Sequence, residues 1–341
     1  MPRSSLIRLV LLALMWGSSF LWIKYALHGL SPVQITTIRL VLGALFLLGM
    51  CAVTGIRLSG DRAVWGHLAV VSLVGNFIPF ALFSFAGRTV DSGLSGVLNA
   101  TTPLWTLLIA LLVRQEKRPG PGRVAGLVLG FAGTLVILAP WQGSGGTLGG
   151  SLMAATAALC YGVTLVYTSR FVVSRGVRSV TLATMQISLA AVWGLLALPF
   201  GGLEPVRLDP IVVIAVVVLG LLGTGYAFVL VNRLLIDEGP TSASTVTYLL
   251  PVIAVLLGAA VLDEALNARV LGGMVIVLAG VMLAQRRPKA PAAAAVETPE
   301  PVETPEPVET SEAAETPEPM AADAAPLAQT SRRSAAQRDS S

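Results

Sequence analysis

Ten stretches of mostly apolar residues, each long enough to cross a membrane, restrict the fold of this chain more than any other feature of its sequence. A helix that crosses the roughly 30 Å hydrocarbon core of a bilayer needs about 20 such residues. Short segments rich in Gly, Pro and charge separate the stretches and favour turns. We therefore predict ten transmembrane helices, at residues 6–27, 33–53, 64–87, 93–113, 122–139, 149–169, 180–200, 210–231, 241–262 and 269–285.

The composition agrees with a membrane protein and argues against several other classes. Hydrophobic residues make up 54% of the chain, charged residues 12%, and the mean hydropathy is +0.77, outside the range of ordinary soluble domains. A net charge of +4 is more typical of basic loops at the inner membrane face than of a nucleic-acid site, so we expect no nucleic-acid partner. Cys51 and Cys160 both lie in apolar runs, and we expect neither a metal site nor a cofactor.

The distribution of positive charge predicts how the chain is oriented in the membrane. The first apolar stretch follows a basic start, as a signal peptide does, but it continues without a cleavage motif, so we expect it to be retained as a helix. Lys and Arg residues near the span ends divide fifteen to four in favour of the side that holds the N-terminus. This bias predicts that both termini are cytoplasmic, in a multi-pass protein of the cell membrane.

Residues 290–341 differ from the rest of the chain. They carry 10 acidic and 3 basic residues, and the hexapeptide ETPEPV occurs at 297 and 303 with degenerate copies at 309 and 315. Such a segment cannot bury a core, so we expect a disordered, Pro/Glu-rich cytoplasmic tail.

The membrane part matches itself at an offset near 147 residues. Trp16-Gly17 corresponds to Tyr161-Gly162, the triplet at 37–39 to that at 184–186, and Pro103 to Pro251. We interpret the chain as a duplicated five-helix unit, with a first repeat at 1–143 and a second at 144–289. Because five is odd, the second repeat is inverted, as in secondary transporters, where the substrate site lies near the midplane between the halves. The predicted fold is an all-α integral membrane protein of two inverted five-helix repeats.

Several segments resemble one transporter family. These are LALMWGSSFLWIKYAL in the first span, ITTIRLVLGALFL in the second, SGLSGVLNATTPLWTLLIALLV in the fourth and ASTVTYLLPVIAVLLGAAVLDEAL in the ninth. Over residues 6–285 the chain resembles the drug/metabolite transporter superfamily, specifically its ten-helix EamA branch with two EamA repeats. The resemblance implies export of amino acids, metabolites or drugs without ATP hydrolysis. The second half departs from the first by carrying Gln186 where the first has Arg39, which predicts an asymmetric cavity.

Arg39 is a charged residue inside an otherwise apolar span. It follows the outer end of that span by about six residues, which places it roughly 9 Å deep at a rise of 1.5 Å per residue. One interpretation is an arginine that extends to the outer headgroups or pairs with a backbone carbonyl. The other is a cation that faces the cavity between the halves and binds a carboxylate or phosphate of the substrate. The polar residue at the matching position, Gln186, supports the second interpretation.

Other polar, aromatic and proline residues inside the spans are further candidates to line a substrate cavity. Hydroxyl and Gly residues in membrane helices commonly serve close packing instead, whereas a proline releases a backbone carbonyl that needs a partner. The cavity candidates, besides Arg39, are Trp16, Ser18, Asn76, Asn99, Thr102, Tyr161, Gln186, Tyr226, Thr247 and Tyr248. The candidate helix breaks are Pro79, Pro103 and Pro251.

These residues bear on three functional classes. A secondary exporter of a small polar or amphipathic metabolite agrees with the inverted repeat and the intramembrane cation. A membrane enzyme requires paired acids, a Ser/His pair or metal ligands at membrane depth, and no Asp or Glu lies in the middle of any predicted span. A non-transporting sensor or scaffold acting through the acidic tail is the alternative.

The glycines at 126, 130, 133, 273 and 280 predict close helix packing, between the halves or between subunits, and leave homo-oligomerisation open.

Overall fold

The computed structural model is helical, and it describes residues 3–115, 120–138, 145–172, 175–231, 233–234 and 246–285. Eight helical stretches of at least 18 residues are apolar enough to cross a membrane, and two shorter apolar helices, Leu249–Leu262 and Ala268–Ala284, follow them. These ten segments confirm the predicted all-α membrane architecture. The predicted tail at 290–341 lies outside the described residues.

The first half contributes five spans, three of which change their helical geometry or are interrupted along their length. In chain order they are α1 (Arg3–Gly17) with α2 (Ser19–Ala26), α3 (Pro32–Thr54), α4 (Arg62–Ser72) with the π-helical segment η1 (Leu73–Phe77) and α5 (Ile78–Ala86), α6 (Ser92–Asn99) with α7 (Thr102–Leu112), and α8 (Pro121–Leu138).

The second half repeats this order. Its spans are α9 (Gly145–Phe171), α10 (Ser179–Ala197) with a 3₁₀ turn at Leu198–Phe200, α11 (Pro210–Val217) with the π-helical segment η5 (Val218–Tyr226), α13 (Val246–Leu262) and α14 (Ala268–Gln285). Both third spans therefore contain a π-helical segment, η1 in one half and η5 in the other.

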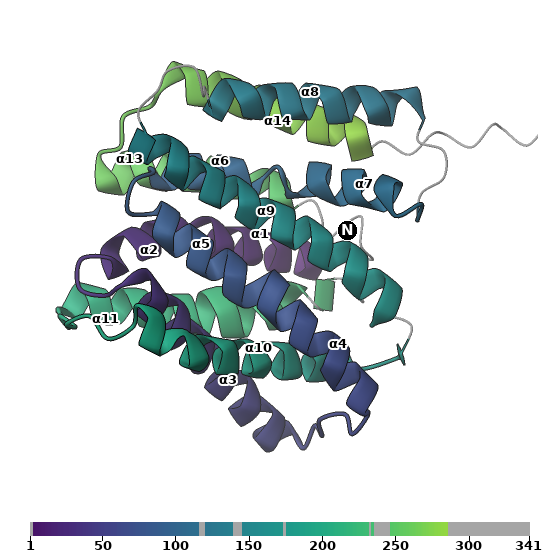
Figure 1. The fold of residues 1–341 in the computed structure, drawn as a ribbon, viewed down its shortest axis with the longest axis vertical. Helices are drawn as coiled ribbons and strands as arrows, with labels where there is room; N and C mark the ends of the chain where they lie inside the picture. The colour runs from purple at the N-terminus through teal and green to yellow at the C-terminus, as the bar shows by residue number, and fades with distance from the viewer. Residues whose placement is uncertain are drawn as a thin grey trace, which may run out of the picture. The chain divides into compact units, whose positions relative to one another are not determined.

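Helices at equivalent positions of the two halves pack against each other. The second spans meet as α3 and α10, the fourth and ninth as α6 and α13, and the fifth and tenth as α8 and α14, a pair that lies side by side in Figure 1. The second span of each half also contacts the third span of the other, α3 with η5 and α10 with α4 and η1. This arrangement is the one expected of two repeats related by a two-fold axis in the membrane plane.

Glycines bring α8 and α14 together. A side chain at Gly126 would meet the backbone of Gly280 and Ala284, and one at Gly280 would meet the backbone of Gly130. Small residues let two membrane helices approach closely enough for their backbones to touch. The predicted close packing of these glycines is thus confirmed, and it joins the two halves of one chain.

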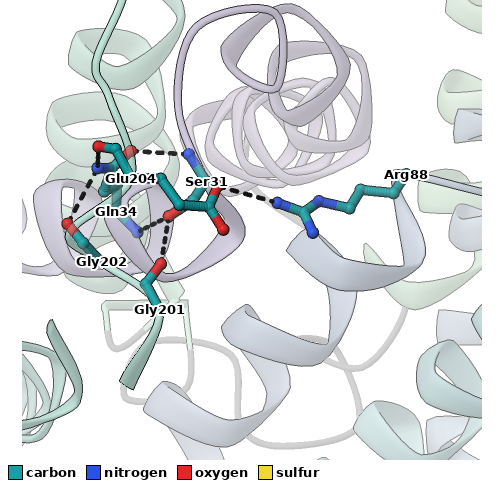
Figure 2. A network of polar contacts seen from close by, with 6 residues as sticks. All are labelled: Ser31, Gln34, Arg88, Gly201, Gly202 and Glu204. Atoms are coloured by element: carbon teal, nitrogen blue, oxygen red, sulfur yellow. Dashed lines mark hydrogen bonds and ion pairs between the residues drawn. The ribbon is translucent and has the colours of Figure 1, made fainter. Parts of the chain in front are cut away.

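A polar network joins the halves at the end predicted to face outward (Figure 2). Ser31 is the N-cap of α3 and forms a capping box with Gln34. The Ser31 hydroxyl accepts from the Gln34 backbone N–H, and the Ser31 backbone N–H donates to Gln34 Oε1. The Ser31 hydroxyl donates to the Gly201 carbonyl at 2.8 Å, and Gln34 Nε2 donates to the carbonyls of Gly202 and Glu204 at 3.0 and 2.8 Å. An exposed ion pair between Arg88 and Glu204, at 3.6 Å, continues the network.

Candidate functional site

Arg39 lies in the interior of the protein, between the two halves. Its side chain is 3% exposed, and its Nε donates a hydrogen bond of 3.3 Å to the hydroxyl of Thr224 in η5. The guanidinium carbon lies 3.8 Å from the centre of the Phe80 ring, a favourable cation–π distance. Arg39 thus contacts a hydroxyl of the opposite half and an aromatic ring of its own half, and it does not extend to the membrane surface.

No carboxylate within the described ranges lies at ion-pair distance from Arg39. An uncompensated buried charge is costly, because burial removes the hydration of the ion without supplying a counter-charge. A guanidinium in this position attracts an anion, and its planar fork of donors matches a carboxylate or a phosphate.

The π-helical segment η5 packs against α3 beside Arg39. Wider helical turns leave backbone groups without their usual partners, and two side chains supply replacements. Trp16 Nε1 donates to the Gly223 carbonyl at 3.2 Å, and the Thr224 hydroxyl donates to the Leu219 carbonyl at 2.9 Å. Trp16 therefore lies beside the place where η5 crosses α3, which we call the first crossing. Its ring makes an edge contact with Phe228 at 6.3 Å between centroids.

The second crossing, where α10 of the second half packs against η1 of the first half, pairs two amide side chains. Gln186 of α10 donates from Nε2 to Oδ1 of Asn76 in η1 at 2.5 Å. Asn76 is 1% exposed, and its Nδ2 has no hydrogen-bond partner within the described part of the chain. Second spans thus meet π-helical segments twice, once through a cation and a hydroxyl and once through two neutral amides.

Tyr161 lies near both crossings without bonding to them. Its ring stacks on Phe83 with centroids 6.3 Å apart and an interplanar angle of 27°. It also packs against two hydrophobic clusters, one of which contains Phe80. The first span of each half therefore contributes an aromatic ring that contacts a ring of the other half. The pairs are Trp16 with Phe228 and Tyr161 with Phe83.

The remaining candidates lie elsewhere or serve the backbone. Ser18 donates to the Met15 carbonyl at 3.3 Å, and Thr102 donates to the Asn99 carbonyl at 2.8 Å. Asn99 Oδ1 is buried without a partner in the described ranges. Tyr226 is 38% exposed, and no described hydrogen bond or ring contact joins it to Arg39. The side chains of Thr247 and Tyr248 lie outside the described residues.

The three prolines affect their helices differently. Pro79 is the second residue of α5, just after η1, where the wider turn accommodates a residue that has no N–H to donate. Pro103 lies in the first turn of α7, two residues after the Ala100–Thr101 interruption that ends α6. Pro251 lies inside α13, which continues through it.

Sequence reasoning did not single out Thr224, Phe80 or Ser92. The carboxylate of Glu264 accepts from the N–H groups of Ser92 and Gly93 at 2.7 and 3.1 Å and from the Ser92 hydroxyl at 2.9 Å. It therefore caps α6 of the other half. Glu116, the matching residue of the first half at the same repeat offset, lies outside the described residues. The repeat offset could have identified Thr224, because this residue occupies nearly the position in the second half that Asn76 occupies in the third span of the first half.

Fold and site together define a multi-pass helical membrane protein built of two equivalent halves, with a buried arginine between them that has no acidic partner among the described residues. The EamA-like transporter family matches residues 3–139 and 148–285. The chain belongs to this family, and it is therefore a transporter and not an enzyme.

Relatives that match most of the membrane part include two that are named as transporters. An uncharacterized inner membrane transporter of Escherichia coli K12, YedA, is 25% identical over 262 residues, covering 75% of this chain and 82% of YedA. An uncharacterized transporter of Archaeoglobus fulgidus is 25% identical over 279 residues, covering 81% and 95%. An uncharacterized protein of Pseudomonas aeruginosa is 29% identical over 293 residues, covering 81% and 95%.

A crystal structure of a protein with 23% sequence identity has the same fold. Its TM-score is 0.59, and the match covers 84% of this chain and 98% of that one.

Proposed function

We propose that the protein exports small metabolites that carry a carboxylate, such as amino acids or amphipathic drug-like acids, by alternating access and without ATP. The observation that carries the proposal is the buried guanidinium of Arg39, which has no acidic partner in the described ranges. An anionic substrate supplies the missing counter-charge, and release of the substrate leaves the site ready for the next one.

The position of Arg39 supports alternating access. Its two contacts come from different halves, Phe80 from the first and Thr224 from the second. A rocking motion of one half against the other changes the distance between these contacts, so that the cation is presented to one membrane face and then to the other. The positive-inside bias of the sequence supports cytoplasmic termini and a cell-membrane location.

The experiment compares exported metabolites of cells that express the wild type, Arg39→Gln or the control Arg207→Gln, at equal membrane levels. Arg207 is an exposed residue of the loop before α11, so its variant removes an arginine without touching the site. We expect one class of carboxylate-bearing solutes to accumulate outside the cells with the wild type and the control, and about tenfold less of it with Arg39→Gln.

Equal export by Arg39→Gln and the wild type would contradict a substrate contact at Arg39. A chain that ends at 289 should keep this export. A cellular effect that is lost with that chain, while the full chain exports no solute beyond cells that lack it, would instead favour a non-transporting sensor or scaffold that acts through the acidic tail.

A further inference from the structure

A polar groove of about 480 Å³ opens at the end of the membrane part that is predicted to face the cytoplasm. One wall is the loop between α3 and α4, including Arg57 and Ser59, and the other is the segment that leads into α10, including Arg175, Arg178 and Thr181. The walls belong to different halves of the chain. A weak hydrogen bond of 3.4 Å from the Thr181 hydroxyl to the Arg57 carbonyl links them.

The groove carries an excess of positive charge. Arg175 is engaged, because its guanidinium lies 3.2 Å from the Asp61 carboxylate and 3.4 Å from Nε2 of His67. Arg57 and Arg178 have no acidic partner in the part of the chain that the structure describes. Two arginines from opposite walls, neither with an acidic partner in the described ranges, therefore line one hollow, and a guanidinium offers a planar fork of donors to an anion.

The start of α10 adds to this positive potential. Arg178 is the residue before the helix, its backbone is extended at φ −59° and ψ 138°, and its side chain makes no capping hydrogen bond. The first turn of a helix carries partial positive charge on N–H groups that have no partner within the helix. Thr181, in that first turn, lines the groove, so the helix terminus acts on the same space as the two arginines.

The groove lies at the ends of two predicted membrane spans, where lipid headgroups are expected. It borders the last residue of α3 and the first residues of α10, which end two of the membrane spans. Anionic phospholipids gather in the inner leaflet and attract basic residues next to membrane spans. The ligand that combines negative charge, several acceptor oxygens and this location is the phosphate of a phospholipid.

We propose that the groove binds the phosphate of an anionic phospholipid headgroup, held by Arg57 from the first half and Arg178 from the second. The bound phosphate bridges the two halves at the cytoplasmic end. This site is separate from Arg39 and does not depend on the identity of the exported substrate.

The test uses the full chain purified in detergent and exchanged into nanodiscs of phosphatidylcholine alone or with phosphatidylglycerol. The thermal unfolding temperature and the phosphatidylglycerol that co-purifies are both measured. We expect phosphatidylglycerol to raise the unfolding temperature of the wild type, and the double variant Arg57→Gln/Arg178→Gln to retain about fivefold less of this lipid. The variant should unfold at the wild-type temperature in phosphatidylcholine, because both side chains are exposed.

The control is Arg62→Gln, an exposed arginine at the start of α4 that does not line the groove. It should retain phosphatidylglycerol as the wild type does. Equal loss in the control and the double variant would overturn the proposal in favour of diffuse surface charge. Stabilisation by inorganic phosphate in detergent, without a further effect of phosphatidylglycerol over phosphatidylcholine, would overturn the lipid as the source of the phosphate.

Discussion

The two crossings between second spans and π-helical segments occupy equivalent places but use different chemistry. In one, Arg39 of α3 meets Thr224 of η5, and in the other, Gln186 of α10 meets Asn76 of η1. The amide pair at the second crossing needs no ligand for its main hydrogen bond. The guanidinium at the first crossing has one hydroxyl and one aromatic ring as neighbours and no counter-charge in the described ranges.

The comparison separates what holds the halves together from what acts on a substrate. Each crossing pairs the second span of one half with the π-helical segment of the other half, so this backbone arrangement does not require a charge at either one. A buried ion without a partner lowers stability, and proteins retain such residues where function needs them. We therefore expect substitutions at the two crossings to have opposite effects on stability, and only those at Arg39 to reduce export.

The largest effect is expected for Arg39→Met. Export of the carboxylate-bearing substrate should fall by at least about tenfold, because the charge-assisted contact is lost. The unfolding temperature should rise, because an apolar side chain of similar length replaces an unpaired buried charge, a change worth about 1–3 kcal/mol. Flux and thermal unfolding of the same purified protein check both signs, and a lower unfolding temperature would show that Arg39 is a structural residue.

The second effect is expected for Gln186→Met. This change leaves Oδ1 of Asn76 without the bond that Gln186 provides, next to an Nδ2 that has no described partner. An unsatisfied buried amide costs about 1–3 kcal/mol, so the unfolding temperature should fall while export per folded molecule stays near the wild-type value. Gln186→Asn is the milder companion variant, and loss of export without loss of stability would contradict the assignment.

A smaller effect is expected for Thr224→Val, which keeps the shape of the side chain and removes its hydroxyl. The variant loses the acceptor for Arg39 Nε and the donor to the Leu219 carbonyl. With one positioning bond lost, worth about 1 kcal/mol, we expect roughly fivefold weaker apparent affinity for the substrate. Concentration-dependent transport measures it, and an unchanged affinity would mean that Phe80 alone positions the guanidinium.

The smallest effect extends the comparison to two carboxylates that precede helices. Asp61 accepts from the Ala63 N–H at 2.8 Å, and this bond lowers its pKa. Asp91 precedes α6, whose N–H groups are occupied by Glu264, and burial raises its pKa, with a further rise from Glu264 and an opposing effect of Lys24.

The signs of the two pH dependences are opposite. The ionised form of Asp91 is disfavoured in the folded protein, so its contribution to stability falls as pH rises through the ordinary aspartate range toward its raised pKa. Asp91→Asn should therefore stabilise the protein slightly at pH 7, and the gain should vanish at acidic pH. Asp61 stabilises above its ordinary pKa and loses this contribution as pH falls, so Asp61→Asn should destabilise at pH 7. Thermal unfolding at both pH values checks the pair, and equal signs would contradict it.

The sequence predicts much of the fold because hydrophobic length is a local property. Each of the ten spans is predicted from its own residues. The offset near 147 residues identifies Gln186 as the residue of the second half that corresponds to Arg39, and this step needs no contacts. The glycines of α8 and α14 were also predicted to pack closely, because only small side chains allow backbones to touch.

The partners within the site could not be predicted in the same way, because they depend on packing between the halves. Thr224 is one of many threonines in the sequence, and its contact with Arg39 arises where η5 crosses α3. Tyr226, chosen as an aromatic at membrane depth, is instead 38% exposed. Pro251 has the residue type of a helix break, yet α13 continues through it.

The most direct test of the central assignment measures ligand binding to the purified protein. Thermal unfolding of the wild type and Arg39→Gln is followed with a panel of amino acids and other organic acids, each paired with the amine or amide that lacks its carboxylate. We predict that one or more acids stabilise the wild type while their counterparts without the carboxylate do not, and that Arg39→Gln loses this response. Equal stabilisation of both proteins by the same acid would contradict a role of Arg39 as the anion contact.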